Sequence, residues 1–335
     1  MRTAGDKDKL RGASRRANAA GRSARAAGVR TAAHAVRDSL ATVDGLILGE
    51  DLARARGLLE DILARSDNPA AWWKYARVLE IAGEDIAARA VRRTVFLKIK
   101  DPNILDVISA RVPYVQPHIY PEFRLVYLSV PKCGSSTIKD GFLVGEGKPA
   151  RGERSHHATR ERSELVALDA LRLQHAGSDI VAIIRPPLER VRSYWKKNIA
   201  ESSSLAREVH GRESFYGLST HPSYLEILSN FHRYRAVFRG FRLHTDALPG
   251  FLGYDPGLLN ILGTMRDINR VLSLIEERSG REVPKIYNMR SPTEEHPVAP
   301  EIAALEEALM AGFYAEEMAY YGRYFDEAAA SDRDR

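Results

Sequence analysis

The sequence predicts an α/β domain built on a parallel sheet flanked by helices, with a separate helical region before it. Two observations carry this prediction. Apolar runs typical of strands occupy residues 123–130, 179–184 and 258–264, and a segment with the helical spacing of apolar residues follows each of them. Alternating strands and helices favour a parallel sheet covered by helices. Residues 300–325 are also expected to be helical, so helices close the domain.

Helical spacing also marks residues 38–100. Apolar residues recur at three- and four-residue intervals, Asn68 and Pro69 start a second helix, and Gly83 turns the chain into a third. Pro69 and Pro102 lie 33 residues apart, a spacing similar to that of one tetratricopeptide unit. Because a single unit does not form a stable solenoid, we expect these helices to pack on the main domain or to bind a protein partner.

Charge is spread unevenly along the chain. Residues 1–37 hold ten of the 50 Lys and Arg residues but two of the 44 Asp and Glu residues, so the remainder is close to neutral. We therefore expect a basic, flexible arm at 1–37, a tetratricopeptide-like region at 38–110 and the main domain at 111–330. A near-neutral main domain predicts no nucleic-acid partner. The arm offers a basic surface to an anionic partner such as a membrane.

Cysteine usage and apolar runs bear on the compartment. Cys133 is the single cysteine, so no disulfide can form within the chain and a reducing compartment is allowed. No apolar run approaches the roughly 18 residues that a membrane helix needs, and none follows the positive N-terminus as in a secretory signal. The arm, rich in Arg, Ala and Ser, also resembles an organelle transit peptide. We expect a cytoplasmic protein and leave that alternative open.

The first strand runs into a turn that can hold an anion. Lys132 brings a positive charge just before Gly134, and a helix is expected to begin at Ser135. The first turn of a helix offers unpaired N–H groups and a dipole that favours an anion, and hydroxyl groups add donors. The expected binding residues are Lys132, Cys133, Gly134, Ser135, Ser136 and Thr137. A Walker A loop would place its lysine after the glycines, and no His, Cys or carboxylate cluster has ligand spacing, so we expect no metal.

The second strand ends in a basic segment. Arg185 directly follows the apolar run, at the carboxyl end of the strand, where open α/β sheets bind ligands. Pro187 suits the first turn of the next helix, and Ser193 lies about two turns along it. The planar guanidinium of Arg185 fits a phosphate, and Ser193 can donate a second hydrogen bond. The competing interpretation is a basic amphipathic helix whose Arg190 and Arg192 are merely solvated.

These two segments, each after a strand and in this order, resemble the sulfotransferases that use 3′-phosphoadenosine-5′-phosphosulfate (PAPS). Val-Pro-Lys-Cys-Gly-Ser-Ser-Thr at 130–137 is similar to that family's 5′-phosphosulfate loop. Arg-x-Pro-x-x-Arg-x-x-Ser-x-aromatic, beginning at Arg185, is similar to its 3′-phosphate motif. The third strand and the closing segment at 313–325, with Glu316 or Glu317 as its acidic residue, look most like the carbohydrate branch of the family.

The resemblance implies a P-loop-like parallel sheet, PAPS as the donor without a metal, and a hydroxyl of a carbohydrate or glycolipid as the acceptor. Transfer would be in line, with Lys132 stabilising the charge on the leaving phosphate. In related enzymes a polar loop closes over the nucleotide, and residues 284–297 look like that loop. Lys285 and Arg290 are therefore expected as further contacts to the 3′-phosphate.

The acceptor hydroxyl also needs a general base, a role that His and acidic residues commonly fill. His156 and His157 lie in a polar stretch after the first helix of the sheet domain, and loops at strand ends are where catalytic groups gather. We prefer His157 of the two, although adjacent loop residues point in different directions. His244, Glu153 and Glu161 are the alternatives.

Two other functions fit parts of the pattern. A nucleotide kinase or another P-loop enzyme would also use a strand–loop–helix phosphate site, but the Walker pattern is missing. A helical-repeat scaffold with an inactive sulfotransferase-like domain would explain the N-terminal helices, but Lys132, Arg185 and Ser193 are all present. Binding of 3′-phosphoadenosine-5′-phosphate (PAP), compared with ATP, distinguishes the three.

Overall fold

The computed structural model describes residues 35–99, 112–286 and 299–330. By its internal contacts the chain divides into two compact units, Met1–Ala82 and Gly83–Arg335. The basic arm expected at 1–37 falls outside the described residues except for its last three, which belong to the helical residues 35–48. None of the helices in the described ranges is both long and apolar enough to cross a membrane.

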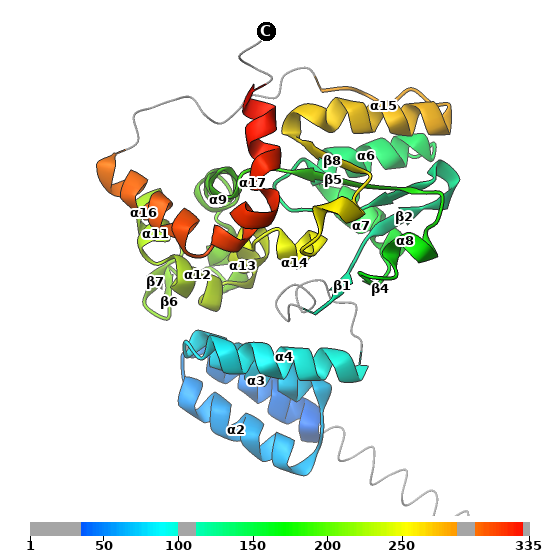
Figure 1. Cartoon of the computed structure of the whole chain (residues 1–335). Helices are drawn as coiled ribbons and strands as arrows, with labels where there is room; N and C mark the ends of the chain where they lie inside the picture. The colour runs from blue at the N-terminus through cyan, green and yellow to red at the C-terminus, as the bar shows by residue number, and fades with distance from the viewer. Residues whose placement is uncertain (1–34, 100–111, 287–298, 331–335) are drawn as a thin grey trace, which may run out of the picture. The chain divides into compact units, whose positions relative to one another are not determined.

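The first unit is helical, as the sequence predicts. Helical residues 35–48 are followed by α2 (Leu52–Arg65) and α3 (Pro69–Ile81) (Figure 1). The side chains of Asp51 and Asn68 each accept a hydrogen bond from the backbone N–H three residues further on, so a capping residue begins each of these helices. The apolar faces bury one core, made of Val43, Ala55, Leu59, Ile62, Ala71 and Val78.

The third helix expected in the N-terminal region, α4 (Asp85–Ile99), groups with the second unit. Its Phe96 packs edge-on against Tyr114, with 5.4 Å between the ring centroids. Tyr114 belongs to β1 (Tyr114–Val115), a short strand of the second unit. The division between the units therefore lies before α4, inside the region that the sequence analysis groups as 38–110.

A four-stranded mixed sheet forms the centre of the second unit. Its strands run in the order β2 (His118–Tyr120), β3 (Leu125–Tyr127), β5 (Asp179–Ile184) and β8 (Ile261–Thr264). β3, β5 and β8 are parallel, as the sequence predicts. β2 pairs antiparallel with β3, so the predicted parallel sheet is mixed at this edge. β2 is short and lies between Pro117 and Pro121 without a longer apolar run around it, which is why the sequence did not reveal it.

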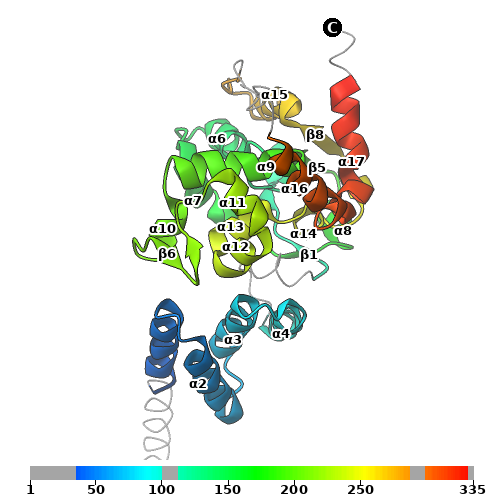
Figure 2. The same ribbon diagram turned by 90° about the vertical axis from the view of Figure 1, so that its left-hand side faces the viewer.

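Each parallel strand leads into a helix (Figure 1). α6 (Ser135–Gly145) follows β3, α9 (Pro187–Tyr194) follows β5, and α15 (Ile268–Ser279) follows β8. α6 and α15 pack closely, because a Cβ at Gly141 would lie 2.6 Å from Leu272 Cδ2. The four apolar residues that predict α15 are all buried: Ile268, Val271, Leu272 and Ile275. α17 (Ala315–Ala330) lies beside β8 (Figures 1 and 2).

The remaining elements are short and connect these layers. The helices and single turns are η1 (Pro121–Phe123), η2 (Gly152–Arg154), α7 (Ser155–Ala158), η3 (Arg160–Arg162), α8 (Leu171–Gln174), α10 (Ser204–Glu208), α11 (Tyr224–Ser229), α12 (Phe231–Val237), α13 (Arg239–Thr245), α14 (Pro249–Leu252), η5 (Pro256–Leu258), η6 (Met265–Asp267) and α16 (Pro300–Ala311). α9 continues as a π-helix, η4 (Trp195–Ala200). The short strands are β4 (Val166–Ala167), which pairs with β1, and β6 (Ser214–Phe215), which pairs with β7 (Leu218–Ser219).

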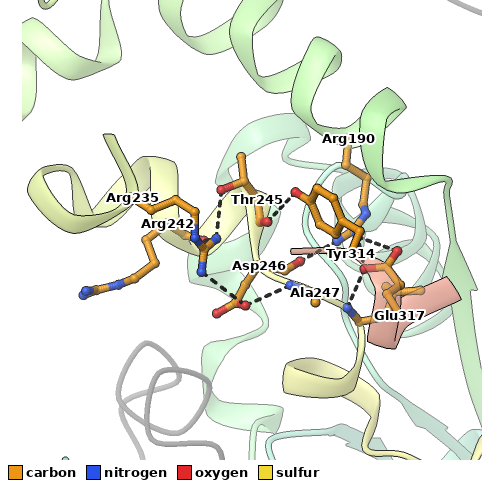
Figure 3. A network of polar contacts seen from close by, with 9 residues as sticks. Arg190, Arg235, Arg242, Thr245, Asp246, Ala247, Tyr314 and Glu317 are labelled. Atoms are coloured by element: carbon orange, nitrogen blue, oxygen red, sulfur yellow. Dashed lines mark hydrogen bonds and ion pairs between the residues drawn. The ribbon is translucent and has the colours of Figure 1, made fainter. Parts of the chain in front are cut away.

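A buried ion pair ties α9 to α17 (Figure 3). Arg190 is 1 % exposed and Glu317 is fully buried. The Arg190 guanidinium donates to Glu317 Oε1 at 2.7 Å and to the carbonyl of Asp246 at 2.7 Å, while the Leu248 N–H donates to Glu317 Oε2 at 2.9 Å. The interpretation of Arg190 as a solvated charge is therefore wrong. Arg192, the other arginine of that interpretation, is half-buried and donates to Glu306 at 2.8 Å.

The same network extends to α13 (Figure 3). Arg235 forms an ion pair with Asp246 at 3.3 Å and donates to the hydroxyl of Thr245 at 3.0 Å. The Tyr314 hydroxyl donates to the carbonyl of Thr245 at 2.7 Å. These contacts join α9, α12, α13 and α17 through polar groups that are paired inside the domain, and the orientation of α9 depends on them.

Replacing Glu317 by alanine should lower the free energy of unfolding by about 3–5 kcal/mol, because Arg190 would stay buried without its carboxylate. Urea unfolding measures the change. Glu316→Ala is the matched control, since Glu316 is the preceding residue of the same helix but is exposed. Its free energy should shift by less than about 0.5 kcal/mol. Equal destabilisation by both variants would contradict the role assigned to the buried pair.

Candidate functional site

The candidate site lies where the three parallel strands end. β3, β5 and β8 point the same way, so the loops after Tyr127, Ile184 and Thr264 meet at one edge of the sheet. This is the edge at which open α/β sheets bind ligands. Two of the three loops carry the residues that the sequence singled out, and the third brings α15 against them.

The 131–137 loop has an unusual backbone. Lys132 and Gly134 both lie in the left-handed region, with φ values of 64° and 70°. Gly134 is also the N-cap of α6, and no side chain caps this helix end. A Cβ at Gly134 would lie 2.4 Å from Ile268 Cδ1 of α15, so only glycine fits the turn. Left-handed backbone at a residue other than glycine is strained, and such strain gathers at ligand sites.

The side chains of this loop differ in what they can offer a ligand. Ser136 and Thr137 are partly exposed at the start of α6, whereas Ser135 is buried. Cys133 is fully buried in the core, and burial raises the pKa of its thiol to about 12. Cys133 can therefore contribute its backbone N–H to an anion, while Ser136 and Thr137 can also contribute hydroxyls.

Lys132 is held at this edge of the sheet by two partners. Its Nζ donates to Asn198 Oδ1 at 2.7 Å and lies 5.9 Å from the centroid of the Tyr194 ring. Asn198 belongs to the π-helix η4, a rare element that often marks functional sites. The sequence analysis missed Asn198, because a contact across 66 residues leaves no pattern in the sequence.

Arg185 stands at the end of β5 with its guanidinium largely buried. Its Nε donates to Glu189 Oε2 at 2.7 Å, one turn along α9. Arg185 lies close enough to the 131–137 loop for its charge to oppose the raised pKa of Cys133. Ser193 lies farther along α9 and is partly exposed. The structure thus brings the two sequence motifs to neighbouring positions, with the guanidinium of Arg185 on one side and the uncapped N-terminus of α6 on the other.

His156 lies against the 131–137 loop. Its Nε2 is 3.0 Å from Ser136 Oγ, and its Nδ1 is 3.0 Å from Lys139 Nζ. His156 belongs to α7, the short helix that follows the loop after α6. His156 and His157 are both exposed, but His157 makes no hydrogen bond to the loop in the part of the chain that the structure describes. The geometry therefore singles out His156, whereas the sequence analysis prefers His157.

His244 is the second histidine near this loop. Its ring stacks on Tyr194 with 4.6 Å between centroids, and its Nδ1–H donates to the carbonyl of Gly240 at 2.7 Å. Burial lowers the pKa of His244 to about 4, and the charge of Lys132 adds to the shift. A base with so low a pKa is weak at neutral pH, which makes His244 a poorer proton acceptor.

The other sequence candidates are less well placed or are not described. Glu161 is exposed on η3, and the side chain of Glu153 lies outside the described residues. Arg290 also lies outside them. Lys285 is described, and its Nζ donates to Glu276 Oε2 at 2.6 Å, so it is already paired on the surface of α15.

His118 and Lys139 are two further residues beside the site that the sequence analysis missed. His118 of β2 is buried, and its Nδ1–H donates to the carbonyl of Thr159 at 3.2 Å. Burial, together with the charge of Lys139, lowers the pKa of His118 to about 3. A signal for Lys139 was present, because it lies one turn after Ser136 and so shares its face of α6.

Metal and family comparisons add no further assignment. Among the residues that the structure describes, no three His, Cys, Asp or Glu side chains lie together as they would around a metal ion. Comparison of the chain with protein-family models, with curated proteins and with solved structures finds no match.

Proposed function

We propose that the protein is a sulfotransferase that moves a sulfuryl group from PAPS to a hydroxyl of a carbohydrate or glycolipid. One observation carries the proposal. An uncapped helix start with Lys132 beside it, the Arg185 guanidinium and the His156 imidazole all lie at the carboxyl edge of one sheet. The strand–loop–helix arrangement is P-loop-like, although its lysine precedes the glycine instead of following it.

The anion-binding groups match the two charged ends of this donor. The N–H groups at the start of α6 and the hydroxyls of Ser136 and Thr137 would hold the 5′-phosphosulfate. Among the described residues, Glu189 contacts the guanidinium of Arg185 only at Nε. The terminal nitrogens of Arg185 would therefore bind the 3′-phosphate, with Ser193 as a second hydrogen-bond donor. The donor would then bridge the loops after β3 and β5.

Transfer then needs one proton acceptor and one electrophilic group. His156 Nε2 would take the proton of the acceptor hydroxyl while the acceptor oxygen attacks sulfur. The bond between sulfur and the 5′-phosphate oxygen breaks, and its electron pair leaves on that oxygen, which makes PAP. Lys132 would stabilise the negative charge that develops there.

The first test is nucleotide binding. Isothermal titration should show PAP binding to the whole chain and far weaker binding of ATP. Arg185→Ala should weaken PAP binding by about 1.5–3 kcal/mol, because a charged hydrogen bond to the 3′-phosphate is lost. Arg93→Ala, an exposed arginine of α4, is the matched control and should leave the affinity unchanged. An Arg185→Ala variant with wild-type PAP affinity would refute the assignment of the 3′-phosphate site.

Lys132→Ala should act on turnover more than on binding. Loss of the ammonium that faces the leaving oxygen should reduce kcat by roughly 10²–10³-fold, the range seen when one charge-stabilising donor is removed. Lys148→Ala is the control, since Lys148 is an exposed lysine just beyond the other end of α6. Transfer of labelled sulfate to a panel of glycan and glycolipid acceptors gives the readout. Unchanged kcat in Lys132→Ala would remove Lys132 from the mechanism.

The two adjacent histidines should differ in their effect on turnover. His156→Ala should lower kcat by roughly 10²–10⁴-fold without changing PAP affinity, because a general base acts on the acceptor and not on the donor. His157→Ala should keep near-wild-type turnover, since among the described residues His156, and not His157, is hydrogen-bonded to the loop. The reverse pattern, with His157→Ala inactive, would show that the acceptor approaches from the other side of α7.

A further inference from the structure

Lys139 is a buried lysine inside the candidate site. It lies on the second turn of α6 with 5 % of its surface exposed. Within the described residues its hydrogen-bond partner is His156 Nδ1, at 3.0 Å. An ammonium carries three donors, so a charged Lys139 would keep two of them unpaired in the interior. A neutral amine avoids that cost and can also accept a hydrogen bond.

The protonation of Lys139 determines which form of His156 is stable. A charged Lys139 donates to Nδ1, so the proton of a neutral imidazole must sit on Nε2, which then donates to Ser136. A neutral Lys139 can accept from Nδ1–H, and Nε2 is left with its lone pair facing the loop. Only the second arrangement lets Nε2 take up a proton from an acceptor hydroxyl.

We propose that Lys139 is a positioning residue, whose amine selects the ring nitrogen of His156 that carries the proton and thereby switches Nε2 between donor and base. This inference rests on the proposed function and deepens it, because it describes how the same site is regulated. Lys139 itself lies behind His156 and need not touch the donor or the acceptor.

The histidines that neighbour this pair are kept neutral by burial. The face of α15 that packs on α6 presents apolar residues: Ile268, Leu272 and Ile275. From β2 comes His118, which burial keeps neutral by lowering its pKa to about 3. From α13 comes His244, whose pKa burial lowers to about 4, with smaller contributions from the charges of Lys132 and His156. Burial alone lowers the pKa of Lys139 to about 8.

A pH dependence follows from this pKa. Below about pH 8 Lys139 is charged and holds His156 in the donor form, and above it the amine becomes neutral and the base form is available. Activity should therefore rise with pH through about 8, above the ~6.5 of an ordinary histidine. A lysine that acted through its positive charge would give the opposite pH dependence, because enzyme activity would then fall over the same pH range.

The kinetic test compares three variants in the full chain. Lys139→Met keeps the length and removes the amine; it should lose the rise near pH 8 and lower kcat above that pH by about 10²-fold, the cost of a mispositioned catalytic group. Lys139→Gln offers a neutral oxygen to Nδ1–H at every pH, so it should restore kcat to within about 10-fold and show no rise. Lys148→Met, an exposed lysine near the same helix, should retain the wild-type profile. Acceptor KM and PAP affinity should stay unchanged throughout.

A second readout needs no activity. Nitrogen-15 spectra of the histidine rings, with the His156 signal assigned through His156→Gln, report which nitrogen carries the proton. In the wild type the His156 proton should move from Nε2 to Nδ1 between about pH 7 and about pH 9, and in Lys139→Met this change should be absent. A proton that stays on one nitrogen in the wild type overturns the inference. If instead the His156 proton moves between the ring nitrogens as expected but PAP does not bind, the proposed function is refuted, while the inference that Lys139 controls the protonation of His156 is retained.

Discussion

The site depends first on the buried pair of Arg190 and Glu317. Burial raises the pKa of Glu317, and Arg190 opposes that shift, so each charge makes the other tolerable in the core. Because Arg190 sits in the middle of α9, the pair fixes the helix that begins just after Arg185, carries Ser193 and continues into η4 with Asn198. One ion pair thus sets the position of groups at both ends of the candidate donor site.

Sequence patterns predicted the parts of the fold whose residues are neighbours in the chain. The run at 179–184 is β5, the second part of the run at 258–264 is β8, and the spacing of Ile268, Val271 and Ile275 marks the buried face of α15. Periodicity carries this information because burial on one face repeats with the helix or strand period. The antiparallel β2 was missed because it lies between two prolines without a longer apolar run, whereas its partner β3, equally short, lies within the apolar run at 123–130.

The candidate site was predictable in its motifs but not in its pairings. Lys132, Arg185 and the loop between Lys132 and Thr137 lie at one sheet edge, as two motifs after parallel strands must. The choice between His156 and His157 depends on which residue of a single helical turn faces α6, and a sequence does not record that rotation. The bond from Lys132 to Asn198 depends in turn on the placement of α9, which rests on contacts between distant segments.

Desolvation explains how so many basic groups can share this edge of the sheet. Were His118 and His244 both charged, they would repel Lys132, Lys139 and each other in a medium that screens poorly. Burial keeps both rings neutral, with pKa values lowered to about 3 and about 4, and it brings the pKa of Lys139 down to about 8. At neutral pH the positive potential then comes from Lys132, Lys139, Arg185 and the start of α6, without the two histidines. The same burial that removes charge from the neighbours therefore concentrates it where an anionic donor would lie.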